Sequence, residues 1–194
     1  MKPEKFEALK ENIISQLRSY LLPGLFYHSA DHTLDVLDAA EKLGIAEKIS
    51  AKEIMQLKIA ALFHDSGYLF ASKNHEERSC RIARLMLPGY DVPEDDIDRI
   101  CELIMATQVP HHPKNKLEEI MCDADLDYLG REDFFNLSKN LFLEMKQFQK
   151  VFDERTWNEM QIKFFELHKY FTNTAKKLRA PVKEKHLAAI KALV

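Results

Sequence analysis

The stretch EIMQLKIAALFHDSG, residues 53–67, decides the fold of this chain. It becomes strongly apolar and rich in small residues toward its end, which is typical of a helix at the centre of a helical bundle. Ser50 followed by Glu53 is a capping-box pattern that starts this helix, and Gly67 ends it. A central helix needs other helices around it, so the flanking sequence should supply further amphipathic helices.

Helical periodicity indeed continues on both sides of this stretch. We expect further helices over residues 3–21, from near Asp31 to Gly44, from Asn74 to Pro88-Gly89, from Pro93 to about Gln108, from about Leu117 to Gly130, over roughly 131–150 and 154–178, and after Pro181. No strand pattern and no domain boundary interrupts this series. The sequence therefore predicts an all-α fold, a single-domain multi-helix bundle spanning residues 1–194.

Composition narrows the class of protein. Of 194 residues 46% are hydrophobic, enough for one buried core. The net charge of −3 provides no basic field, so we expect no nucleic acid duplex as partner. The N-terminus is too polar for a secretory signal, and no apolar run approaches the roughly 20 residues that span a bilayer. Three cysteines without a CxxC motif indicate reduced thiols. We therefore expect a cytoplasmic protein with no membrane partner.

The dipeptide His64-Asp65 lies at the end of the apolar helix. A charged carboxylate next to such a run must be paired or bound to a cation, because desolvating it alone costs several kcal/mol. Imidazole with carboxylate suits Mn, Fe, Co, Ni, Mg or Zn. The alternative is a helix C-cap followed by a solvated aspartate.

Other histidines and aspartates accompany this dipeptide. His28 and His32, in YHSADHTLDV (27–36), are four residues apart and share a face if the helix begins early enough to include both. The segment CDADLDYLG (122–130) carries Asp123, Asp125 and Asp127, and Asp123 and Asp125 cannot both face one ion because residues i and i+2 point to nearly opposite sides of a helix. Three further histidines lie between these segments, namely His75 in NHEERSCRIA (74–83) and His111 and His112 in VPHHPKN (109–115).

The order of a histidine, then His-Asp after a small-residue apolar helix, then a distant aspartate resembles the HD-domain superfamily of metal-dependent phosphohydrolases. The matching stretches are YHSADHTLDV, AALFHDSGY, NHEERSCRIA and CDADLDYLG, within residues 27–130, while the helices of residues 131–194 match no known motif. The resemblance implies an HD-type bundle. It also implies that His32, His64, Asp65 and Asp125 hold a divalent metal, with Asp123 as the other candidate for the last position.

The resemblance further implies an enzyme that cleaves a phosphoester of a nucleotide or small phosphorylated metabolite by metal-bound hydroxide. Asp65 would be both ligand and water-orienting base. His75 and one of His111 or His112 would bind a second ion, or stabilise the phosphoryl oxygens and protonate the leaving group. Lys73 and Arg78 are candidates for phosphate binding, unless they are ordinary exposed charges.

Two other functions remain open at this point. A di-iron oxygenase acting on a small polyol or phosphonate uses a similar ligand series, and a ligand-sensing module could retain a residual metal site. In each case the expected partner is a small molecule, anionic and phosphorylated for the hydrolase. The aromatic residues of the C-terminal helices can pack within the chain or across a homodimer.

Overall fold

A computed structural model describes all 194 residues, and they form helices and connecting turns without any strand. The α-helices are α1 (Pro3–Tyr20), α2 (Ala30–Ala46), α3 (Ala51–Phe63), α4 (His75–Met86), α5 (Glu94–Ala106), α6 (Lys116–Asp125), α7 (Phe134–Gln147), α8 (Glu154–Leu167), α9 (Asn173–Leu178) and α10 (Ala180–Lys191). Short 3-10 helices follow α3, α4 and α6, namely η1 (Ser66–Leu69), η2 (Leu87–Tyr90) and η3 (Asp127–Gly130). The predicted all-α fold is confirmed. No helix combines the length and apolar character that a bilayer crossing requires.

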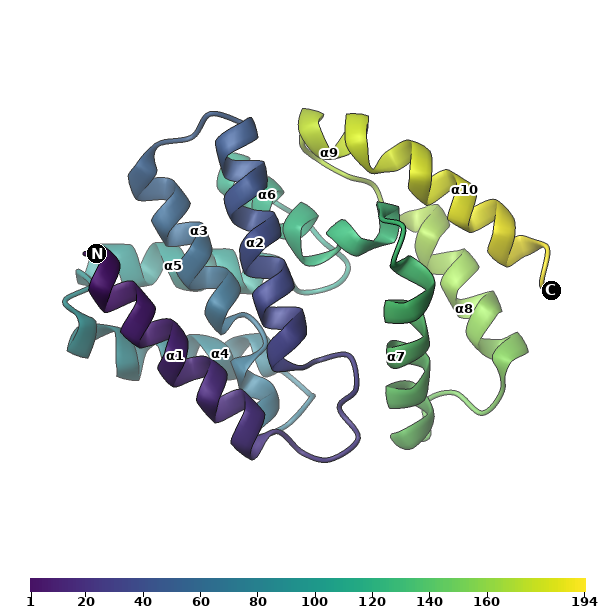
Figure 1. Cartoon of the computed structure of the whole chain (residues 1–194), viewed down its shortest axis with the longest axis horizontal. Helices are drawn as coiled ribbons and strands as arrows, with labels where there is room; N and C mark the ends of the chain where they lie inside the picture. The colour runs from purple at the N-terminus through teal and green to yellow at the C-terminus, as the bar shows by residue number, and fades with distance from the viewer.

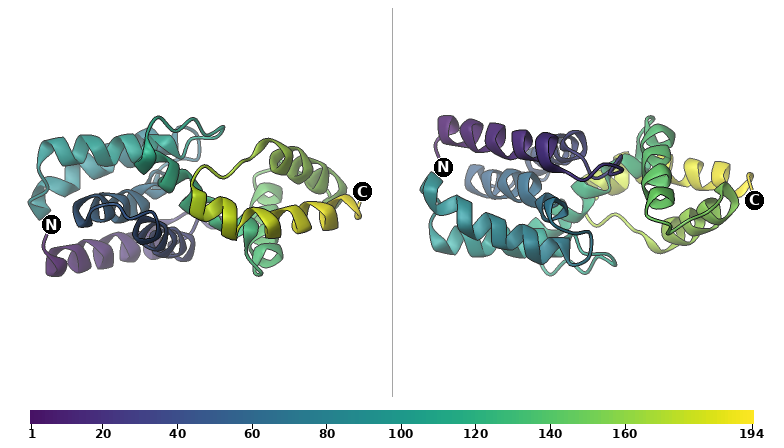
Figure 2. Two further views of the ribbon diagram at one scale, coloured as in Figure 1. Left: turned by 90° about the horizontal axis from the view of Figure 1, so that it is seen from above. Right: turned by 90° about the horizontal axis from the view of Figure 1, so that it is seen from below.

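Helix α3 is the centre of the N-terminal part of the molecule. It packs against α1, α2, α4, α5 and α6. Its last seven residues from Leu57 onward are almost all fully buried, and Ala60 and Ala61 let neighbouring backbones approach closely. Figure 1 shows α1 to α6 gathered on one side and α7, α8 and α10 on the other, and both views in Figure 2 show the same division.

Five of the ten α-helices begin at a side chain that caps them by accepting a backbone hydrogen bond. The capping box before α3 forms as predicted, with Ser50 Oγ accepting from the Glu53 amide and the Glu53 carboxylate accepting from the Ser50 amide. Asn74 precedes α4, but its side chain makes no capping hydrogen bond. Its backbone instead adopts the left-handed conformation, with φ 53°, which asparagine tolerates better than most residues.

The C-terminal helices differ from the sequence prediction at one place. A continuous helix over 154–178 was expected, but α8 ends at Leu167 and α9 begins at Asn173. The amides of Phe171 and Thr172 donate to the carboxylate of Asp123, at 2.9 and 2.8 Å, so they are not available to a helix. Thr172 then caps α9 by accepting from the amide of Ala175. A distant carboxylate therefore decides where the helix breaks.

The C-terminal helices attach to the N-terminal part through η3. The Arg179 guanidinium donates to the Asp127 carboxylate at 2.7 Å, and the Tyr170 hydroxyl donates to the carbonyl of Leu126 at 3.1 Å. At Gly130 an added Cβ would lie 2.4 Å from the Arg179 carbonyl oxygen, so the close approach requires glycine. These contacts fix α9 and α10 beside the segment that carries the aspartates.

Candidate metal centre

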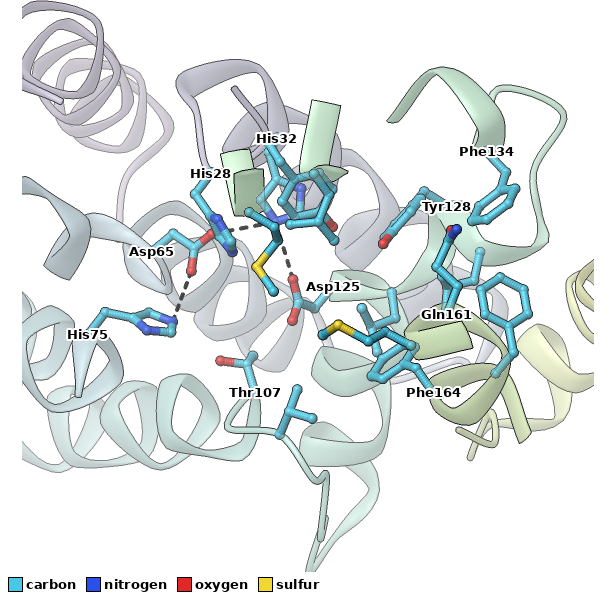
Figure 3. A pocket seen from close by; sticks show the side chains of 18 of the residues that line it. His28, His32, Asp65, His75, Thr107, Asp125, Tyr128, Phe134, Gln161 and Phe164 are labelled. Carbon is cyan, nitrogen blue, oxygen red and sulfur yellow. Dashed lines mark ion pairs between the residues drawn. The ribbon is translucent and has the colours of Figure 1, made fainter. Parts of the chain in front are cut away.

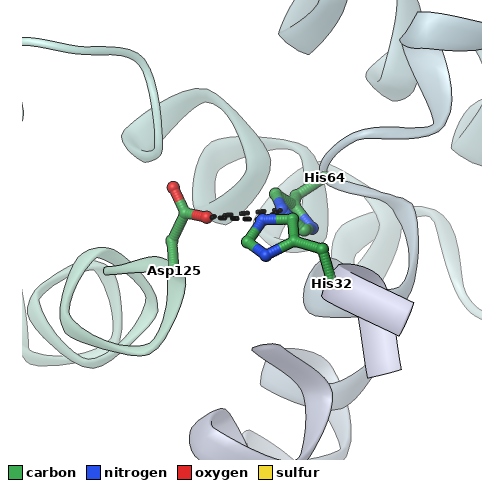
Figure 4. A group of neighbouring side chains, drawn as sticks. All are labelled: His32, His64 and Asp125. Carbon is green, nitrogen blue, oxygen red and sulfur yellow. Dashed lines mark hydrogen bonds and ion pairs between the residues drawn. The ribbon is translucent and has the colours of Figure 1, made fainter. Parts of the chain in front are cut away.

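Side chains from three helices meet at one point. His32 lies in the first turn of α2, His64 directly after α3, and Asp125 at the end of α6. The Nε2 atoms of the two histidines are 3.4 Å apart, and Asp125 Oδ1 lies 3.3 Å from His32 Nε2 and 3.4 Å from His64 Nε2. Figure 4 shows the three groups pointing toward one another. Three donor atoms that converge so closely are typical of a metal site.

Local structure fixes the orientation of both histidines. Ser29 caps α2 by accepting from the His32 amide, which places the buried His32 ring at the start of the helix. His64 Nδ1 lies 2.7 Å from the carbonyl oxygen of Ala61. A carbonyl only accepts, so Nδ1 carries the hydrogen and the lone pair of Nε2 faces the centre. This second contact prepares the ring for a cation.

Asp65 completes the cluster. Its Oδ2 lies 3.2 Å from His64 Nε2 and 3.5 Å from His32 Nε2, while its Oδ1 lies 3.3 Å from the Nε2 of His75. Although Oδ2 is buried, it accepts no hydrogen bond. A buried carboxylate oxygen without a donor is costly unless a cation is near it. Two imidazole nitrogens and two carboxylates therefore fit a divalent ion, with Asp65 reaching toward a second position beside His75.

The charges within the cluster depend on one another. Burial raises the pKa of the Asp65 carboxyl, but His64 and His75 outweigh it and hold that pKa well below its usual range. Asp125 responds in the same way to His32 and His64. Burial lowers the pKa of His64, and the two carboxylates raise it well above its ordinary value. Protons on the histidines therefore compete with a cation for this site.

Asp123 and Asp125 point in different directions, as their spacing on a helix predicts. Asp123 is fully buried, and both of its oxygens accept backbone hydrogen bonds from Phe171 and Thr172. Burial raises its pKa to about 6, even though these donors act in the opposite sense. Asp125, and not Asp123, is the aspartate that lies with the histidines.

His28, Tyr68 and Glu144 surround the cluster, and sequence reasoning assigned no functional role to Tyr68 or Glu144. The ring of His28 lies between the carboxylate of Glu144, which bonds its Nδ1, and the hydroxyl of Tyr68, which lies 3.1 Å from its Nε2. Glu144 comes from α7 and is buried. The signal for Glu144 was present, because it is a lone carboxylate within the apolar run LFLEM, but its partner could not be identified.

The other candidate residues lie in different places. His75 reaches Asp65, as described above. His111 Nε2 is 3.1 Å from the carbonyl of Thr107, and the ring lines an adjoining cavity of about 280 Å³, where burial lowers its pKa. His112 lines the same cavity and also a polar pocket on the α4–α5 side. Lys73 is exposed and Arg78 is half-buried, and neither lines the cavity beside the cluster. The structure thus brings His75 to the cluster and leaves the other four away from it.

A cavity of about 380 Å³ opens beside the cluster, and 13 of its 21 lining residues are hydrophobic. Figure 3 shows Asp65 and His75 at one end and Phe134, Gln161 and Phe164 at the other. The cluster comes from the N-terminal helices, whereas much of the apolar wall comes from α7 and α8. The cavity is therefore formed by both parts of the molecule.

Comparison with known proteins agrees with this architecture. A family model described as HD domain matches residues 29–127, about half of the chain. A predicted HD superfamily hydrolase from an uncultured Thermotogales bacterium has a similar structure, with a TM-score of 0.63 and 19% identity over 96% of this chain and 90% of the other. Bacillus subtilis YpgQ, solved in complex with ADP, is similar with a TM-score of 0.65 and 19% identity over 95% of each chain. No curated protein matches this sequence.

Proposed function

This chain belongs to the HD-domain family, and from that premise we propose that it is a metal-dependent phosphohydrolase that cleaves a small phosphoester. The observation that carries the proposal is the buried Asp65 Oδ2, which has no hydrogen-bond donor and faces the two converging histidine nitrogens. His32, His64, Asp65 and Asp125 would hold the divalent ion. When bound, such an ion lowers the pKa of a coordinated water and offsets charge on the phosphoryl group.

The residues of this chain have distinct tasks in the proposal. The two oxygens of Asp65 face different histidines, so this carboxylate can bind one ion while orienting a water molecule, or can bridge two ions. His75 Nε2 lies 3.3 Å from Asp65 Oδ1 and the ring lines the cavity, so His75 is placed to donate a proton to the leaving group. One bound ion would leave His75 in this role, and two ions would make it a ligand.

The position of the loop histidines argues against the oxygenase alternative. A di-iron site with the longer ligand series would need His111 or His112 at the cluster, yet both lie in other cavities. The intact set of His32, His64, Asp65 and Asp125 argues against a ligand-sensing module with only a residual metal site. Hydrolysis assisted by a divalent ion at His32, His64, Asp65 and Asp125 is the function that this arrangement supports best.

The substrates to test first are phosphoesters, and nucleotides are included because the Bacillus subtilis neighbour was solved with ADP. The purified protein would be loaded with Mn, Fe, Co, Ni, Mg or Zn, analysed for bound metal, and assayed against a broad set of phosphoesters. His64→Ala and Asp65→Ala should lose both bound metal and turnover while circular dichroism still shows a helical fold. Turnover that persists in both variants would refute the proposed function.

A further inference from the structure

The cavity beside the metal centre has two chemically different ends. One end carries the titratable side chains that surround Asp65. The other end is formed by residues of α7 and α8, namely Leu141, Met145, Trp157, Met160, Phe164 and Phe165. Aromatic rings and flexible thioethers are surfaces that fit apolar groups of varied shape. The apolar end therefore offers a surface to the part of a substrate that is not phosphate.

Charge limits how many phosphates this cavity can accept. None of its 21 lining residues is a lysine or arginine, whereas Asp65, Glu76 and Asp125 all contribute carboxylates. Sites for phosphate groups usually supply guanidinium or ammonium groups to balance their charge. A phosphate monoester carries a charge of about −1.5 to −2, which one or two divalent ions can balance here. A second or third phosphate would add charge that no lysine or arginine of this wall offsets.

Two polar side chains of the cavity wall, Gln161 and Thr107, are already hydrogen-bonded within the protein. Gln161 Oε1 accepts from the hydroxyl of Ser138 at 2.6 Å, and Gln161 Nε2 donates to Asn158 at 3.2 Å. The Thr107 hydroxyl donates to the carbonyl of Ile104 at 2.8 Å. Among the side chains of α7 and α8 that form the apolar end, only the Trp157 indole N–H could donate a hydrogen bond to the hydroxyls of a sugar or the edges of a base. A substrate whose sugar hydroxyls or base edges lose their hydrogen bonds to water and find no partner in the cavity would bind weakly.

We propose that the substrate is a phosphate monoester of an apolar alcohol, with its phosphate at the metal centre and its hydrocarbon or aromatic group against α7 and α8. This inference rests on the proposed hydrolase function and assigns a role to the C-terminal helices. In the reaction the oxygen of water bonds to phosphorus, the bond from phosphorus to the ester oxygen breaks, and that oxygen takes a proton and leaves as the alcohol. The products are inorganic phosphate and the free alcohol.

A chain-length series tests the proposal with the full-length protein and Mn²⁺. Butyl, hexyl and octyl phosphate, glycerol phosphate, AMP and ADP would be compared by kcat/KM. Each added methylene should raise kcat/KM roughly three- to fourfold until the cavity is filled, as expected for burying one CH₂. ADP should be the poorest substrate. Equal values along the series, or a preference for AMP or ADP, would overturn the inference and leave the hydrolase function intact.

Binding provides a readout that does not need turnover. Butyl-, hexyl- and octylphosphonate cannot be hydrolysed, and their affinities for the Mn²⁺-loaded protein can be measured by calorimetry. Affinity that rises with chain length would support binding of an apolar group against α7 and α8 even if no phosphoester were cleaved. The experiment therefore separates failure of this inference from failure of the proposed hydrolase function. Affinity that is independent of chain length would overturn the inference.

Two leucines on α7 provide a matched pair of variants. Leu141 lines the cavity, whereas Leu143, two residues later, is 39% exposed and lies outside it. Leu141→Lys should reduce the octyl-to-butyl preference at least tenfold and improve ADP relative to octyl phosphate, and Leu143→Lys should change neither. If Leu141→Lys does not fold, Met160→Lys serves instead, because Met160 lines the cavity and is 39% exposed. An unchanged preference in the folded cavity variants would overturn the inference.

Discussion

The carboxylate of Glu144 on α7 bonds the ring Nδ1 of His28, a residue that lies 116 positions earlier in the chain. The same carboxylate accepts the backbone amides of Tyr27 and His28, at 3.0 and 3.1 Å. The segment before α2 is therefore held by a helix of the cavity wall. Because this segment leads directly to His32, Glu144 connects that wall with the metal centre.

Glu144→Gln should destabilise the protein and weaken catalysis together. Replacing the buried carboxylate by an amide removes a charge-assisted bond to His28 and turns one acceptor into a donor that faces backbone amides. We expect a loss of about 1–3 kcal/mol in the free energy of unfolding, measured in urea, and a lower kcat/KM. Glu159→Gln on α8, whose side chain is 46% exposed, is the control. A variant as stable as the control would contradict this role.

The two neighbouring aspartates of α6 should give opposite results. Asp125→Asn should lose most bound metal, because it removes a proposed ligand. The cost in the free energy of unfolding should be small, because the substitution also removes repulsion between the carboxylates of Asp125 and Asp65. Asp123→Asn should retain metal but lose about 1–3 kcal/mol, because the amides of Phe171 and Thr172 lose a charged acceptor. Metal analysis and urea unfolding of both variants would check this. Normal metal content in Asp125→Asn would remove this residue from the site.

Gly67→Ala should disturb the turn that presents Asp65. A Cβ at this position would lie 2.0 Å from the carbonyl oxygen of His75, so the backbone must shift. We expect a loss of about 1–3 kcal/mol in thermal or urea unfolding, together with weaker metal binding. At Gly89 an added Cβ meets nothing within 4 Å, so Gly89→Ala should leave both quantities almost unchanged. Equal effects of the two substitutions would show that the close approach is unimportant.

The carboxylate of Glu47 should contribute to the free energy of unfolding in a pH-dependent way. The Lys116 ammonium, which bonds its carboxylate at 2.6 Å, and the Thr174 amide lower the pKa of Glu47 from 4.5 to about 2. A carboxyl whose pKa is lowered on folding stabilises the protein above its ordinary pKa, and that stability is lost as the pH falls through the lowered value. Glu47→Gln should therefore cost about 1–2 kcal/mol at pH 7 and progressively less below pH 4.5.

The control for this experiment is Glu132→Gln, which changes an exposed side chain. Urea unfolding of the wild type and both variants at pH 7, 4 and 3 gives the comparison. A difference between the wild type and Glu47→Gln that stays constant from pH 7 to pH 3 would contradict the proposed ionisation.

Most of the N-terminal architecture and the main cluster could be predicted because their signals are local. The apolar helix that ends in His64-Asp65 predicts the centre of the bundle. In the same segment, the charge of Asp65 beside an apolar run predicts a bound cation or another partner. The side chains of His32 and Asp125, which the family resemblance added, do lie with that pair. The spacing of Asp123 and Asp125 correctly indicated that only one of them could face the histidines.

The parts that sequence could not predict depend on distant partners. In residues 168–172 only Thr172, a possible N-cap, indicates a new helix start, and the acceptor that holds the amides of Phe171 and Thr172 is Asp123, almost fifty positions away. Glu144 and Tyr68 gain their roles through contacts with His28 and its neighbour Tyr27, far from either of them in the sequence. Likewise, His111 looked equivalent to His75 in sequence, and only the course of the loop after α5 places it in another cavity.

The anchoring of Asp123 and Asp127 has a consequence for the minimal folding unit of this protein. The HD-domain match ends at residue 127, but the donors to these two buried carboxylates belong to Phe171, Thr172 and Arg179. An excised fragment covering residues 29–127 would lose these donors, and it would expose the core surface that Phe6, Leu9 and Ile13 cover in the whole chain. We expect such a fragment to be unfolded by circular dichroism, since the sequence signature and the cooperative unit do not coincide.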